Sequence, residues 1–495
     1  MAIVRRPVRD SAQSDSTPFR AAASSLILAS VKPKAKTRVS QQVSPARAAA
    51  FDILLRVERE SSYAAELLHS GAYDSISTVD HSLTTELVMG VLRWRSLLDT
   101  QISQISAQPL FKLDIEVLTA LRLAVYQMRW LSRIPSRAAI NESVELVKRA
   151  RKRSAASFVN AVLRKFAAAI SPGSELSPPE ISSESVEALA GSSAHPLWLV
   201  ERWVRAYGIE ATRDICRHNQ SVPVTAIRLR HPQAEEQLRL EEIDLAAGAL
   251  LASARRVRHG DITLTRAFRE GRCVIQDEGS QLVAALVGTG ARILECCAAP
   301  GGKVLALSDK NPSANITAID LHPHRARLLR RLIRAHNADG KIVANNIIVI
   351  AADARNPPFT SKFDRVLADV PCSGTGTLSR NPEIKWRLTS KDLSELHVRQ
   401  LAILRSAMAQ VAAGGRLIYS TCSLEKEENE DVVEAALEGD AAFRQVDCAV
   451  ELRALQQQEE LVWPNLSSLT RGPYLRTLPG THPCDGFFAA ILGKI

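Results

Sequence analysis

The chain has 495 residues, of which 46% are hydrophobic, 23% charged and 5% aromatic, which excludes a disordered or fibrous protein and predicts two or three folded domains. No apolar run reaches the roughly 18 to 20 residues needed to cross a bilayer, so integral membrane placement is excluded. Eight cysteines without any C-x-x-C pair fit neither a disulfide framework nor a usual zinc site, and they predict reduced thiols in a cytoplasmic protein.

The formal net charge of +10 favours a polyanionic partner. Residues 1–44 contain eight basic and only two acidic residues, and they do not assemble the pattern of a secretory signal. We therefore predict that residues 1–44 form a disordered basic arm, which would add salt-sensitive affinity for a polyanion.

Helices dominate the next part of the chain. Apolar residues recur at helical spacing within residues 46–59, 83–105, 115–131, 140–150 and 157–169. This pattern predicts an all-helical domain over residues 45–170. Residues 171–193 are rich in proline and serine and predict a linker, and residues 194–285 mix helix-like and strand-like runs and predict a small α/β subdomain.

From residue 286 onward, apolar strands alternate with helices. Strands are predicted at 292–296, 316–320, 347–353, 365–370 and 416–421. The alternation predicts a mostly parallel, doubly wound α/β sheet over residues 286–495. A ligand of such a sheet binds at the carboxyl ends of the strands.

The first of these strands runs into the glycine-containing turn CAAPGGK, residues 297–303. Such a turn lets backbone N–H groups approach a ligand closely. A phosphate-binding P-loop would need a glycine at 297 and a serine or threonine at 304, where this chain has Cys297 and Val304. A nucleoside triphosphate is therefore disfavoured, as is a dinucleotide, since no G-x-G-x-x-G occurs.

Acidic residues end four successive predicted strands. They are Glu295, Asp320, Asp353 and Asp369. Asp320 lies where a doubly wound fold places a carboxylate on a ribose diol. Asp353 considered alone could equally well be a helix cap, but capping explains the set of four acidic residues poorly.

Two cysteines follow neighbouring strands of the predicted sheet. Cys372 follows the fourth strand and Cys422 follows the fifth. A single cysteine is usually a buried apolar residue. Two thiols near Asp369 at one edge instead indicate a cleft in which a thiolate could act as a nucleophile.

Three motifs together resemble the RNA cytosine-5 methyltransferases that use S-adenosyl-L-methionine: CAAPGGK at 297–303, DVPCSGTG at 369–376 and STCS at 420–423. Residues 276–281, 380–386 and 485–488 resemble further segments of these enzymes, the second of them a loop on the substrate side. Residues 83–93 and 158–164 resemble the RNA-binding NusB fold. The combination is similar to the RsmB family, also called Sun or Fmu, of small-subunit (16S) ribosomal RNA cytosine-5 methyltransferases. The family usually has Asp at position 295 and Thr or Ser at position 304.

The resemblance implies a Rossmann-like class I methyltransferase sheet after an all-α NusB-like domain, and small-subunit ribosomal RNA as the substrate of a cytoplasmic monomer without membrane or metal partners. It assigns Cys422 as the nucleophile, Cys372 as the base that releases the product, and Asp369 as the group that holds ring nitrogen 3. It assigns cofactor binding to Cys297, Ala298, Ala299, Pro300, Gly301, Gly302, Lys303, Asp320, Asp353 and Asp369.

Two alternatives stay open. A transfer RNA cytosine-5 methyltransferase would use the same chemistry, although the NusB-like domain argues against it. A non-catalytic RNA-binding protein of antitermination or ribosome assembly would keep the fold without turnover. The pair of Cys372 and Cys422 argues against this second alternative, because a scaffold needs no thiols at those strand ends.

Overall fold

The computed structural model describes residues 43–60, 62–73, 75–170, 180–231, 233–335 and 346–495. The chain divides into two compact units, residues 1–41 and 42–495, and every described residue belongs to the second. The predicted basic arm, apart from residues 43 and 44, and residues 171–179 of the predicted linker lie outside the described residues.

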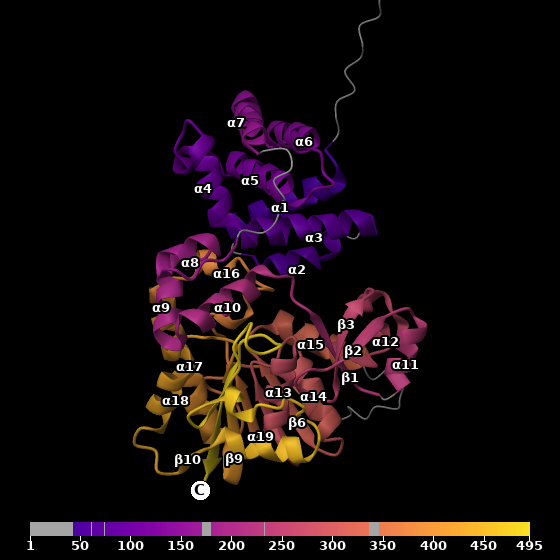
Figure 1. Ribbon diagram of the computed structural model, residues 1–495. Helices are drawn as coiled ribbons and strands as arrows, with labels where there is room; N and C mark the ends of the chain where they lie inside the picture. Colours follow the sequence, from indigo (N-terminus) through magenta and orange to yellow (C-terminus); the bar gives the residue numbers. More distant parts are fainter. Residues whose placement is uncertain (1–42, 61, 74, 171–179, 232, 336–345) are drawn as a thin grey trace, which may run out of the picture. The chain divides into compact units, whose positions relative to one another are not determined.

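Seven α-helices form the first part of the described chain (Figure 1). The single helical segment expected over 83–105 is two helices that meet at Trp94, which leaves the helical conformation with φ −100° and ψ 13°. The Trp94 ring stacks on Trp130 at a centroid distance of 5.4 Å, so an aromatic contact occupies the break. The helices are α1 (Pro45–Glu60), α2 (Ala64–Leu68), α3 (Thr78–Arg93), α4 (Arg95–Ile105), α5 (Ile115–Trp130), α6 (Ser136–Arg149) and α7 (Ala156–Ala169).

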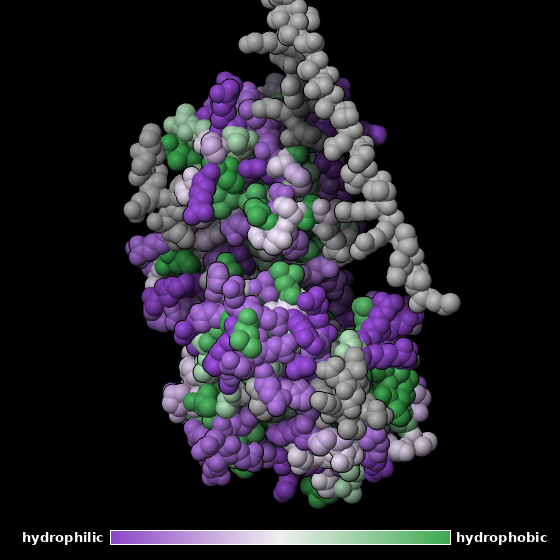
Figure 2. Space-filling view, turned by 90° about the vertical axis from the view of Figure 1, so that its right-hand side faces the viewer, coloured by the Kyte–Doolittle hydropathy of each residue, from purple (hydrophilic) through white to green (hydrophobic). Residues whose placement is uncertain are grey.

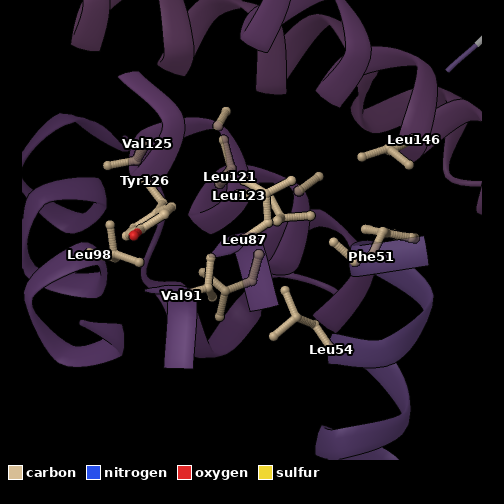
Figure 3. Close-up of a cluster of buried hydrophobic side chains, with 14 of the residues drawn as sticks. Phe51, Leu54, Leu87, Val91, Leu98, Leu121, Leu123, Val125, Tyr126 and Leu146 are labelled. Carbon is tan, nitrogen blue, oxygen red and sulfur yellow. The ribbon is translucent and has the colours of Figure 1, made fainter. Parts of the chain in front are cut away.

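The apolar stripes of these helices meet in one core, part of which Figure 3 shows. Helix α5 is central to this core, because it is buried on nearly every side from Val117 to Met128. Its Leu121 is fully buried among residues of the same cluster, such as Leu87 of α3 and Leu54 of α1.

Leu121→Ala is expected to lower the free energy of unfolding of this helical region by about 2–5 kcal/mol, because the truncation leaves a cavity. Phe111→Ala is the matched control, since the Phe111 side chain is 84% exposed and its loss should change the free energy of unfolding by less than about 0.5 kcal/mol. Urea denaturation followed by circular dichroism measures both. Equal effects of the two substitutions would contradict this description of the core.

The region after the helical domain differs from the prediction in two ways. Helix α8 (Val186–Ser192) occupies part of the predicted linker 171–193, since Leu189 and Ala190 are buried. The predicted subdomain 194–285 divides between different cores: α8, α9 (Leu197–Tyr207) and α10 (Ile209–Gln220) pack with Leu378, Ile384 and Leu424. The sequence pattern predicts the helices but not these partners, because the partners lie more than 150 residues away along the chain.

A small antiparallel sheet follows, with strand order β2-β3-β1-β4. Its own core includes Ile227, Leu238 and Ile262. The elements are β1 (Thr225–Leu229), α11 (Gln233–Leu240), β2 (Asp244–Ala247), β3 (Ala254–His259), α12 (Arg266–Arg269) and β4 (Cys273–Ile275). Helix α13 (Glu278–Val287) already packs with the large sheet.

Nine strands of the described chain form the large sheet, in the order β11-β12-β13-β9-β8-β5-β6-β7, with β10 beside β13. Strands β9, β8, β5, β6 and β7 run parallel, and β13 pairs antiparallel with β9. The predicted fold class, a helical NusB-like region followed by a small sheet and a Rossmann-like sheet, is confirmed. The strands are β5 (Arg292–Cys296), β6 (Asn315–Asp320), β7 (Ile347–Ala351), β8 (Phe363–Asp369), β9 (Val411–Thr421), β10 (Phe443–Val446), β11 (Thr470–Arg471), β12 (Tyr474–Arg476) and β13 (Phe488–Lys494).

Helices lie in the connections from β5 to β6, from β6 to β7 and from β8 to β9, since parallel strands need such crossovers (Figure 1). The helices are α14 (Gly302–Lys310), α15 (Pro323–Ala335), α16 (Ile384–Arg387), α17 (Ser390–Gln410), α18 (Glu430–Leu437) and α19 (Cys448–Gln457). The face seen in Figure 2 is mainly hydrophilic, with hydrophobic side chains in small separate groups. Among the helices that the structure describes, none combines the length and apolar character of a membrane span.

Candidate active site

The loop 297–303 connects β5 to α14 at the carboxyl edge of the parallel sheet. Gly301 has φ +117°, and a Cβ on it would lie 2.5 Å from Leu329 Cδ1 and 2.9 Å from Leu332 Cδ2 of α15. Only glycine fits this left-handed conformation and this close approach without strain. The turn therefore presents its backbone at the start of α14, as the sequence predicted.

A cavity of about 460 Å³ lies against this loop. Its wall combines residues 297–303 with Glu295 and Asp369, with Phe268 of α12, and with Gln276 and Asp277 between β4 and α13. Glu295 is buried, and its Oε2 has no hydrogen-bond partner among the described residues. Burial raises the pKa of Glu295 well above its ordinary value, which the nearby Lys303 opposes and Asp369 reinforces. The site thus offers an unpartnered carboxyl oxygen and exposed turn backbone to a ligand.

Lys303 connects this cavity to the end of β8. Its Nζ donates to Asp369 Oδ2 at 2.6 Å, and the hydroxyl of Ser420 donates to Asp369 Oδ1 at 2.7 Å. Burial alone would lower the pKa of Lys303, but the charge of Asp369, the hydrogen bond to it and the charge of Glu295 together raise that pKa. Lys303 is therefore a charged ammonium that faces two carboxyl groups.

The other two predicted acidic residues, Asp320 and Asp353, do not belong to the cavity wall. Asp320 is buried at the end of β6, where its two oxygens accept from the backbone N–H groups of Ala299 at 3.2 Å and His322 at 3.1 Å. It therefore supports the loop 297–303 at Ala299. Asp353 lies two residues beyond β7 and pairs with Arg355 at 2.6 Å, which lowers the pKa of Asp353 by hydrogen bonding. Neither Asp320 nor Asp353 lines the 460 Å³ cavity.

The two predicted cysteines meet. Cys372 Sγ and Cys422 Sγ lie 3.3 Å apart, and both residues are partly exposed. The hydrogen bond with Cys422, together with burial, raises the pKa of the Cys372 thiol well above its ordinary value. Either sulfur can be the donor of this hydrogen bond, so the contact pairs a nucleophile with a second group that can carry a proton.

Sequence reasoning missed the residue that holds the two cysteine loops together. Glu428 is fully buried, and its carboxylate accepts from the backbone N–H of Ser373 at 2.8 Å and from the hydroxyl groups of Ser373 and Ser423. Ser373 and Ser423 each directly follow a cysteine. Glu428 lies in an acidic run, EKEEN, that resembles a solvated surface, and nothing in the sequence separates it from its neighbours.

Iodoacetamide at pH 8 is expected to label the partly exposed Cys422 in the native protein and to spare the buried cysteines. Burial raises the pKa of Cys216, Cys273, Cys296 and Cys448 to about 12, so they present almost no thiolate. Mass spectrometry of peptides from native and urea-treated protein measures the labelling. Labelling of the buried cysteines at the same native rate would contradict the arrangement described above.

No cluster of three or more candidate metal ligands occurs among the residues that the structure describes. His322 and His324 lie together at the start of α15, with ring centroids 5.5 Å apart. Three basic residues at and just beyond the end of α6 take part in ion pairs: Lys148 with Glu145, Arg149 with Asp52 and Lys152 with Asp114.

A Rossmann-like sheet with a glycine-containing ligand turn at its carboxyl edge, beside a pair of thiols, is the architecture of a class I methyltransferase. Residues 286–493 match the model of the 16S rRNA methyltransferase RsmB/F family, and residues 44–168 match the NusB family. The chain is 33% identical to "Probable ribosomal RNA small subunit methyltransferase B" of Bacillus subtilis, over 90% of this chain and 98% of that protein. It is 31% identical to "Ribosomal RNA small subunit methyltransferase B" of Pseudomonas putida, over 92% and 99% of the two chains.

The chain therefore belongs to the RsmB/F family of 16S rRNA methyltransferases, with a NusB-family domain at its amino-terminal side. The solved structure of the protein PH0851 has the same fold, with a TM-score of 0.72 and 24% identity over 92% of this chain and 99% of that one. The predicted family and the predicted enzyme class are confirmed.

Proposed function

We propose that the protein methylates carbon 5 of a cytosine in small-subunit (16S) ribosomal RNA, through a covalent bond between Cys422 and the base. The observation that carries this proposal is the contact of 3.3 Å between the sulfur atoms of Cys372 and Cys422. Family membership and the names of the relatives support the class of substrate.

S-adenosylmethionine is the methyl donor that we propose for the 460 Å³ cavity. Residues 297–303 line this cavity, and the unpartnered carboxyl oxygen of Glu295 is a ready hydrogen-bond acceptor. Asp320 would reach the donor's ribose, and Asp353 its adenine, at the rim of the site. To reach the donor, Asp320 would have to release the backbone N–H of Ala299, and Asp353 would have to release Arg355.

The thiols supply the covalent chemistry. Carbon 5 of cytosine is a weak nucleophile, and addition of the Cys422 thiolate to carbon 6 forms a C–S bond and moves electron density to carbon 5. After carbon 5 has gained the methyl group, its proton must leave before the C–S bond can break. We assign removal of that proton to Cys372, directly or through a water, with Cys422 leaving as the thiolate.

Asp369 and Lys303 are the residues that we assign to the contact with ring nitrogen 3. Both oxygens of Asp369 accept hydrogen bonds, from Lys303 and Ser420. For Asp369 to hold ring nitrogen 3 as a donor it needs a proton in the complex. We propose that the Lys303 ammonium, at 2.6 Å, keeps its own proton and orients the carboxyl group of Asp369 towards the ring. Charge that develops on the ring would thus be neutralised by a group already in place.

The reacting cytosine must leave its stack to reach the thiols, so the target is a loop or a helix that opens. We assign RNA binding to the helical domain, residues 45–170, and catalysis to residues 286–495. An rRNA substrate places the reaction in the cytoplasm, and all proposed site residues come from one chain, which is compatible with a monomer.

The test is methyl transfer from labelled S-adenosylmethionine to protein-free 16S ribosomal RNA and to bulk transfer RNA, followed by mapping of 5-methylcytosine. We expect label at carbon 5 of cytosine in the ribosomal RNA. Label in transfer RNA alone would contradict the proposed substrate, whereas the proposed reaction would stand. RNA binding without transfer to either RNA or to assembly intermediates would favour the non-catalytic alternative.

A further inference from the structure

The segment Arg380-Asn381-Pro382-Glu383-Ile384-Lys385-Trp386, which resembles a substrate-side loop, contacts the helical domain instead. Lys385 is only 1% exposed, and its Nζ donates to the backbone carbonyl of Arg93 at 2.9 Å. Trp386 Nε1 donates to the carbonyl of Leu92 at 2.6 Å. Both side chains therefore end on the last turn of α3.

The carbonyls of Leu92 and Arg93 need such partners. The last four carbonyls of an α-helix lack intrahelical donors. Since α3 ends at Arg93 and α4 begins at Arg95, the break at Trp94 leaves these carbonyls for other donors. Lys385 and Trp386 from the methyltransferase region supply them.

Further contacts surround this pair. The guanidinium of Arg93 donates back to the carbonyl of Ser379 at 2.9 Å. Arg387 Nη2 donates to the carbonyls of Val57 and Ser62, each at 2.6 Å, near the end of α1. The buried Glu383 accepts from the backbone N–H of Ala64, the first residue of α2, at 2.8 Å. Helix α16 is thus tied to three helices of the helical domain.

The same segment continues directly from the Cys372 loop. The N–H of Gly376 donates to the carbonyl of Cys422 at 2.9 Å, and a Cβ on Gly376 would lie 2.3 Å from the carbonyl oxygen of Gly486. Leu378 and Ser379 are fully buried, and Arg380 pairs with Asp485 at 2.8 Å. Close packing of this kind leaves little room for movement between Cys372 and Lys385.

We propose that Lys385 and Trp386 are positioning residues, which fasten the Cys372 loop to the end of α3 so that the helical domain and the two thiols keep a fixed geometry. The expected effect on methyl transfer rests on the proposed function. The fastening of the Cys372 loop to α3 is argued from the contacts alone, and the labelling rates of the two cysteines test it separately.

Lys385→Met and Trp386→Phe test the proposal in the full chain, because each removes the donor and keeps most of the apolar side chain. Lys391→Met is the matched control, since the Lys391 side chain is 85% exposed on α17 and pairs only at 3.5 Å with Glu395. Lys385→Gln retains a donor and should restore part of any loss. The readouts are single-turnover methyl transfer, the affinity for S-adenosylmethionine, and the rates of iodoacetamide labelling of Cys372 and Cys422.

We expect single-turnover methyl transfer to fall about tenfold or more in both variants, because small displacements of reacting groups are costly. The affinity for S-adenosylmethionine should stay within about twofold, because neither residue lines the cofactor cavity. Labelling of Cys372 and Cys422 should accelerate while Cys448 stays unlabelled, which shows that the variant is folded. If Lys385→Met unfolds, Trp386→Phe decides alone.

Labelling rates and turnover equal to those of Lys391→Met would overturn the proposal. If the wild-type protein transfers no methyl group to RNA, the proposed function fails, and the labelling rates still decide whether the fastening exists.

Discussion

Cys372→Ala is expected to accumulate a protein–RNA adduct that survives denaturation, whereas Cys422→Ala is expected to form no adduct and no product. Without Cys422 the C–S bond cannot form, and without Cys372 the bond forms but the carbon 5 proton is not removed, so Cys422 cannot leave. Turnover of Cys372→Ala should fall by about 10²–10⁴-fold, the usual contribution of a general base. Denaturing gels of labelled ribosomal RNA with each variant measure the adduct.

Cys448→Ala is the matched control for these variants, because Cys448 is a buried thiol in the core around the sheet. It should neither accumulate adduct nor lose turnover beyond any loss of stability. An adduct that forms with Cys422→Ala and is absent with Cys372→Ala would exchange the two roles. The contact of 3.3 Å between the sulfur atoms is compatible with either order, so this experiment assigns the roles.

Lys303→Met is expected to lower the rate of methyl transfer by about 10²–10³-fold, comparable to the removal of one preorganised donor from an active site. The substitution leaves Asp369 and Glu295 close together without the ammonium that now faces both. Asp369 then loses the hydrogen bond that we propose orients its carboxyl group towards ring nitrogen 3. Single-turnover kinetics with saturating RNA and S-adenosylmethionine measure the chemical step directly.

Lys310→Met provides the comparison, since Lys310 ends the same helix, α14, but is exposed and contacts only the carbonyl of Ala285 at 3.4 Å. Its rate should match the wild-type rate. A normal rate for Lys303→Met would remove Lys303 and its pairing with Asp369 from the mechanism, while the assignment of the thiols would stand.

The main site motifs were predictable because strand alternation is a local signal. Apolar runs of strand length, each followed by a turn, indicate where β5, β8 and β9 end, and parallel strand ends share one edge. Strand pattern alone therefore predicts that Cys372, Cys422 and Asp369 lie in one region. Glu428, Lys385 and the break at Trp94 were not predictable, because each depends on partners far away in the sequence.

The sequence by itself determined the class of fold, the ligand turn and the identity of the thiols, since hydrophobic periodicity and motif spacing are properties of short segments. Tertiary structure alone decided that Asp320 supports the loop 297–303 at Ala299, that Lys303 pairs with Asp369, and that α8 lies within the expected linker. It also directed Lys385 to α3 rather than to a substrate. The physical reason is that a buried charge or polar group must find its partner in three dimensions, and the partner's distance along the chain leaves no trace in local pattern.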